Sequence, residues 1–83
     1  MFWIYYQQHT WLVDSDRNGK VTYYWVLSAV YDDVTGLYTW EIIPSDDGDT
    51  RLTVHGHTLD RAVIEQTILT YEATLPPIPE PVV

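Results

Sequence analysis

The fold class is decided by residues 52–69, LTVHGHTLDRAVIEQTIL, where the spacing of the apolar side chains changes. Up to His55 apolar residues alternate with polar ones, which is typical of a half-buried strand. From Leu59 onward the apolar residues recur at helical spacing. Ile64 and Ile68 then fall on the same face of an amphipathic helix, so the sequence predicts a strand followed directly by a helix.

The predicted helix has signals at both ends. Thr58 is the expected N-cap, and Asp60 falls in the first turn, where a carboxylate is favourable. We expect the helix to end near Ala73, because the prolines of residues 76–83, PPIPEPVV, cannot continue it. These last eight residues are expected to form an extended, Pro-rich tail.

Strand-like runs precede the helix. Aromatic residues make up 14% of the chain, and most lie in alternating runs, where they suit a pleated surface. Asn18-Gly19 is a strong signal for a tight hairpin turn. We expect a bulge or bend at residues 7–10, and strands at residues 2–13, 21–31, 37–43 and 50–55.

Together these elements predict an α+β fold in a single ββββα domain over residues 1–75. Short turns connect the strands, which favours a four-stranded antiparallel β-meander. The C-terminal amphipathic helix is expected to pack on one face of that sheet, and the Pro-rich tail of residues 76–83 to lie outside it.

Composition excludes several classes of function. The 83 residues include 12 acidic and 4 basic side chains, a net charge of −8, and no cysteine. A chain this acidic repels phosphate backbones, so we expect no direct nucleic-acid binding. No apolar run approaches the ~20 residues of a membrane span, and the start lacks the features of a signal peptide. We therefore expect no membrane association and a cytoplasmic location, which is the host cytoplasm if the protein is phage-encoded.

Two sequence patterns contain residues that can bind metal ions, but neither pattern matches a known metal site in full. Asp14-x-Asp16-x-Asn18-Gly19 matches the first half of a calcium-binding EF-hand loop, but Trp25 stands where the bidentate glutamate should be. A hairpin turn is the better interpretation.

The three histidines, His9, His55 and His57, identify no metal chemistry by themselves. Since no nucleophile motif or phosphate-binding loop occurs either, we expect no enzyme activity, no metal and no cofactor.

The acidic turns indicate a binding surface. Turns of a meander alternate between the two ends of the sheet, so two acidic clusters should share one end, while Asp32 and Asp33 lie at the other. Such a negative field suits a basic protein partner. Strand aromatics that remain exposed would add apolar anchors. The predicted partner-binding residues are Asp14, Asp16, Asp46, Asp47, Asp49, Trp3, Tyr5 and Trp11.

Residues 23–73 resemble the HicB-like antitoxin domain. The motifs that carry this resemblance are Tyr31-Asp32-Asp33, Gly36, Tyr38, Pro44, Gly56, Thr58, Leu59 and Ala62. The resemblance implies a non-enzymatic protein that neutralises a toxin by covering a basic RNase. The chain departs from the family at Arg61, where an acidic residue is usual, and in its additional aromatic first strand.

We therefore expect a small acidic inhibitor of a basic, nucleic-acid-handling protein such as a nuclease. An antitoxin and a phage-type nucleic-acid mimic, of the anti-CRISPR or anti-restriction kind, both fit. The alternative is a structural subunit of a larger assembly, such as a phage virion or tail component. In that case the aromatic first strand could pair with a neighbour, including a second copy in a homo-oligomer.

Overall fold

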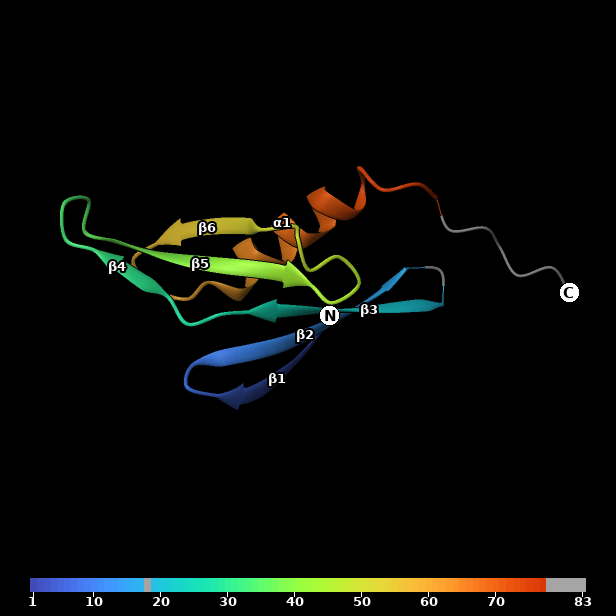
Figure 1. Ribbon diagram of the computed structural model, residues 1–83, viewed down its shortest axis with the longest axis horizontal. Coiled ribbons are helices and arrows are strands. Elements are labelled where there is room, and N and C mark those ends of the chain that lie inside the picture. The colour runs from blue at the N-terminus through green and yellow to red at the C-terminus, as the bar shows by residue number, and fades with distance from the viewer. Residues whose placement is uncertain (18, 78–83) are drawn as a thin grey trace, which may run out of the picture.

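A computed structural model describes residues 1–17 and 19–77 of the chain. They form an α+β fold with an antiparallel sheet of six strands and one C-terminal helix, so the predicted class is confirmed but the predicted count of four strands is wrong (Figure 1). In chain order the elements are β1 (Phe2–Gln7), β2 (Thr10–Arg17), β3 (Lys20–Val26), β4 (Val30–Asp32), β5 (Leu37–Pro44), β6 (Leu52–Gly56) and α1 (Arg61–Glu72).

The first predicted strand is in fact a hairpin of β1 and β2. Gln7 pairs with Thr10, and the two residues between them, Gln8 and His9, have φ angles of 51° and 56°. Positive φ at both central positions is the feature of tight type I′ hairpin turns. The sequence predicted only a bulge or bend here, because neither Gln nor His is a residue that such turns usually select.

The second predicted strand is divided into β3 and β4 by a bulge. Val26 pairs with Ile42, and Val30 pairs with Thr39. The three residues between Val26 and Val30 therefore lie opposite only two residues of β5. One extra residue on one side of a ladder is a β-bulge, and it bends the strand. The hydroxyl of Ser28, inside the bulge, donates a hydrogen bond to the carbonyl of Gln8 in the β1–β2 turn.

The remaining strands follow the predicted meander. Arg17 pairs with Lys20, and Gly19 has a φ of 86°, so the predicted hairpin turn is confirmed. β5 pairs with β3 and β4 along one side and with β6 along the other. β1, β4 and β6 each pair with one strand, so all three lie at edges of the sheet. Pro76 and Pro77 follow the helix, while residues 78–83 of the predicted tail lie outside the described residues.

The helix begins two residues later than predicted. Asp60, not Thr58, is the N-cap, and its Oδ1 accepts hydrogen bonds from the backbone N–H groups of Ala62 (3.0 Å) and Val63 (3.3 Å). Thr and Asp are both good N-cap residues, so local preference could not choose between them. Packing decides, because Leu59 lies against the core before the helix starts.

The hydrophobic core lies between α1 and one face of the sheet (Figure 1). Ile64 and Ile68 supply the helical side of the core, and both are fully buried, as predicted. Alternate residues of β2, β3, β5 and β6 supply the other side. The core residues are Val13, Tyr24, Val26, Trp40, Ile42, Val54, Ile64 and Ile68.

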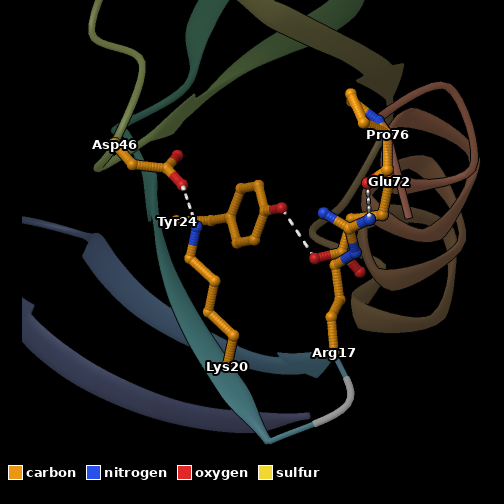
Figure 2. Close-up of polar contacts among 6 residues, drawn as sticks. All are labelled: Arg17, Lys20, Tyr24, Asp46, Glu72 and Pro76. Atoms are coloured by element: carbon orange, nitrogen blue, oxygen red, sulfur yellow. Dashed lines mark hydrogen bonds and ion pairs between the residues drawn. The ribbon is translucent and has the colours of Figure 1, made fainter. Parts of the chain in front are cut away.

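A buried carboxylate completes the contact between the helix and the sheet. Glu72 is 6% exposed, and its two oxygens accept hydrogen bonds from the hydroxyls of Ser15 and Tyr24, each at 2.8 Å. Figure 2 shows the contact with Tyr24. Burial, and then the neighbouring carboxylate of Glu72, raise the pKa of Tyr24 well above its usual range. The phenol therefore stays protonated and acts as the donor.

The core assignment predicts opposite outcomes for two adjacent aliphatic residues of α1. Replacing the fully buried Ile68 by alanine should lower the free energy of unfolding by about 2–5 kcal/mol, because a cavity remains. Leu69 is half exposed, so Leu69→Ala should change it by no more than about 0.5 kcal/mol. Denaturant melts measure both. Equal midpoints for Ile68→Ala and the parent would contradict this packing.

The buried hydrogen bonds predict non-additive effects. In Glu72→Leu, the hydroxyls of Ser15 and Tyr24 lose their acceptor and stay buried. Each unpaired hydroxyl should lower the free energy of unfolding by about 1–3 kcal/mol. In the Tyr24→Phe background, Glu72→Leu should lower the free energy of unfolding by less than it does in the parent, because only the Ser15 hydroxyl is then left without an acceptor. A double-mutant cycle from denaturant melts should give a coupling of about 0.5–3 kcal/mol. Simple additivity would contradict the described contact.

Candidate protein-interaction surface

Both predicted acidic clusters lie at the same end of the sheet. The β2–β3 turn and the β5–β6 loop are neighbours there, since the backbone N–H of Ser45 donates to the carbonyl of Tyr23 at 2.7 Å. The ammonium of Lys20 also lies 4.0 Å from Asp46 (Figure 2). We call this region the acidic end, and it comprises Asp14, Asp16, Asp46, Asp47 and Asp49.

Three of these carboxylates also accept hydrogen bonds from nearby groups of the chain. Asp14 accepts a hydrogen bond from the backbone N–H of Phe2, and Asp16 accepts one from Gly19, both at 2.8 Å. The carboxylate of Asp47 accepts from the Thr50 hydroxyl at 2.6 Å. A carboxylate with one such bond still has free lone pairs, so these groups can also receive hydrogen bonds from a partner.

The predicted separation of the acidic turns holds. Asp32 and Asp33 lie in the turn between β4 and β5, which is at the opposite end from the β5–β6 loop. The carboxylate of Asp32 accepts a hydrogen bond from the N–H of Val34 at 2.9 Å, as expected for an aspartate that opens a turn. The molecule therefore has a second, smaller acidic cluster far from the first along β5.

All four basic side chains of the sequence lie among the described residues, and each has a partner within the chain. Arg17 donates to the carbonyl of Pro76 at 3.1 Å, and Lys20 faces Asp46 (Figure 2). Arg51 lies 4.0 Å from Glu41. The fourth, Arg61, lies over the rings of Trp3 and Trp11, as described next. The contacts leave the net charge at −8, so the molecule presents a strongly negative field to its surroundings.

Two of the three predicted aromatic anchors are engaged with the helix. The Arg61 guanidinium lies 5.1 Å from the ring centre of Trp3 and 4.7 Å from that of Trp11, within cation–π range. The indole N–H of Trp3 also donates to Glu65 at 3.2 Å. Only Tyr5, which stacks edge-on against Trp11, remains half exposed. Trp3 and Trp11 thus stabilise the packing of β1 and β2 against α1.

The large exposed side chains of β1 and β3 lie on the opposite face. Phe2, Ile4, Tyr6 and Tyr23 are all exposed there. The alternation in β1 separates these residues from Trp3 and Tyr5 in the sequence, but alternation does not say which set faces the helix. The structure places all three aromatic candidates, Trp3, Tyr5 and Trp11, on the face that carries the helix.

The histidines do not converge on one site. His55 lies on the face without the helix, with its Nδ1 2.8 Å from the Thr39 hydroxyl. His9 and His57 line a separate pocket of about 480 Å³ near Trp40. Among residues 1–17 and 19–77, no three His, Asp or Glu side chains are grouped so that they could hold a metal ion.

A larger pocket of about 650 Å³ runs between α1 and the edge strand β6. Leu52, Val63 and Tyr71 line it together with threonines of the helix, and no charged side chain contributes to it. Among the described residues that line it, the phenol of Tyr71 is the one titratable side chain.

No family model, curated protein or solved structure matches the chain. The resemblance of residues 23–73 to the HicB-like antitoxin domain therefore stays a prediction. In the part of the chain that the structure describes, no helix combines the length and the apolar character needed to cross a membrane.

Proposed function

We propose that this chain is a small acidic binding protein, without catalytic activity, that inhibits or sequesters a basic protein that handles nucleic acid. The observation that carries the proposal is the distribution of charge. The four basic side chains contact other groups of the chain, whereas the acidic end carries five carboxylates, of which Asp46 alone has an ion pair with one of these cations, Lys20. A site of this kind attracts a positively charged surface and repels phosphate.

The proposed mechanism is competition for a cationic surface. A nuclease binds the nucleic-acid backbone through lysine and arginine side chains, and carboxylates spaced along a protein surface can occupy the same groups. The acidic end presents Asp14 and Asp16 from a strand and Asp46, Asp47 and Asp49 from a loop. Binding there would block the partner without any reaction. The place of action is the cytoplasm, or the host cytoplasm if the protein is phage-encoded.

The sequence resemblance to the HicB-like antitoxin domain supports the antitoxin form of this proposal. The additional hairpin of β1 and β2 is joined to the helix through Arg61, the position at which the chain departs from that family. An anti-restriction or anti-CRISPR inhibitor would use the same charge distribution. The identity of the captured basic protein distinguishes these forms.

The proposal predicts that the position of the acidic charges matters more than their number. Asp47→Asn/Asp49→Asn removes two charges from the acidic end, and the asparagine at position 47 can still accept from Thr50. With the basic partner captured from the native host, this variant should associate about threefold to tenfold more slowly at low salt. Raising the ionic strength should reduce the difference, because screening weakens steering. Stopped-flow or surface-binding kinetics measure the rate.

The matched control is Asp32→Asn/Asp33→Asn. It brings the chain to the same net charge, and its asparagine at position 32 can still accept from Val34. We expect the association rate of this control to fall less than twofold. Equal losses for the two variants, or a rate that does not change with salt, would contradict a role for the acidic end.

A second candidate function is that of a structural subunit, and the edge position of β1 favours it. β1 pairs only with β2, and its aromatic side chains Phe2 and Tyr6 are exposed. The free edge of such a strand can pair with a strand of a neighbouring molecule.

If the chain is a structural subunit, we expect the purified chain to self-associate through β1. Size-exclusion chromatography with light scattering should then give a dimer or larger species, and Tyr5→Pro, which places a proline within the β1 strand, should restore the monomer. A parent chain that is monomeric at all concentrations tested would count against a homo-oligomer. Capture of capsid or tail proteins rather than a basic protein would favour the subunit function.

A further inference from the structure

One complete face of the sheet is left without a covering layer among the described residues. α1 packs on the face that carries Val13, Tyr24 and Ile42. On the other face, Ile4, Leu12, Trp25 and Ile43 pair in register across four strands and form one continuous apolar row. We call this second side the open face, and it comprises Phe2, Ile4, Tyr6, Leu12, Tyr23, Trp25 and Ile43.

The open face has the composition of an interface core. Phe2 is 63% exposed, Tyr6 59% and Tyr23 44%. The ring of Tyr6 stacks edge-on against that of Trp25, with centroids 5.5 Å apart, so these side chains already hold defined positions. Aromatic side chains that are rigid before binding lose little entropy on association, and such residues dominate binding energy in protein interfaces.

Acidic side chains border this apolar surface. Asp14 lies between Phe2 and Tyr23 in the same row, because it pairs with both. Asp16 lies one step further along β2 on the same face, at the acidic end. The open face and the acidic end are therefore one continuous surface with an apolar centre and a negatively charged border.

The charge of that border selects the occupant. Two copies of this chain joined by their open faces, acidic end against acidic end, would oppose the Asp14 and Asp16 carboxylates of each, and the four described basic side chains already contact other groups of the chain. Like charges opposed across an interface cost several kcal/mol. A partner with lysine or arginine around an apolar centre would instead form charge-assisted hydrogen bonds with these carboxylates.

We propose that the open face is the docking surface for the apolar centre of the basic partner, with Asp14 and Asp16 binding its lysine or arginine side chains. The inference rests on the proposed function, and it adds that binding is not electrostatic alone. The partner should present exposed apolar side chains inside a basic border. A flat, purely cationic surface would leave Phe2, Tyr23 and Trp25 without a contact.

Site-specific photo-crosslinking in cells of the native host tests the location. A benzophenone amino acid is placed either at Tyr23 on the open face or at Leu69 on α1, both about half exposed. We expect a covalent adduct with a basic protein from position 23 and none from position 69. Binding of that same protein should then weaken about 30-fold or more in Tyr23→Ser and in Phe2→Ser, the scale of an interface hot spot. Leu69→Ser should bind like the parent.

Denaturant melts verify that each variant is folded. If Tyr23→Ser does not fold, Phe2→Ser at the edge of the sheet provides the same test. A basic protein that crosslinks from position 69 only, or binds both serine variants as tightly as the parent, would overturn the inference and leave the proposed function standing. An adduct between two copies of the chain from position 23 would overturn it in favour of self-association. Failure to capture any basic protein would overturn both proposals.

Discussion

The packing of one short helix against one face of the sheet is the constraint on which the rest of this structure depends. Ile64 and Ile68 close the core, and Glu72, one turn further, is held by the hydroxyls of Ser15 and Tyr24. Without the helix, the inner sides of β2, β3, β5 and β6 would be exposed to water. A domain of this size buries a modest fraction of its surface, so few contacts are available to replace this one.

This constraint explains how the molecule uses its few cations. The helix lies partly over the β1–β2 hairpin, and Arg61 covers the rings of Trp3 and Trp11. Arg17 and Lys20 hold the turn of β2 and β3 against the helix end and the β5–β6 loop. As a result, packing on one side of the sheet leaves both the acidic end and the open face available on the rest of the surface.

Sequence reasoning succeeded where a local pattern has one physical interpretation. The change of period near residue 56 gave the strand-to-helix order, and the spacing of Ile64 and Ile68 gave the buried helical face. It failed at the Gln8–His9 turn and at the bulge before β4, because neither carries a residue typical of a turn or a bulge. It also missed the burial of Glu72, since a carboxylate is buried only when distant donors are present to satisfy it.

The sequence by itself therefore determined the α+β class, the helix that closes the core, and an acidic surface with two acidic turns at one end of the sheet and Asp32 and Asp33 at the other. Tertiary structure alone decided which side of each strand faces that helix. Alternation divides a strand into two sets of side chains but assigns neither to the core, and both sets of β1 are aromatic. Contact with Arg61 and Glu65 placed Trp3 inside and left Phe2 and Tyr6 on the open face, because only a residue far along the chain could break that symmetry.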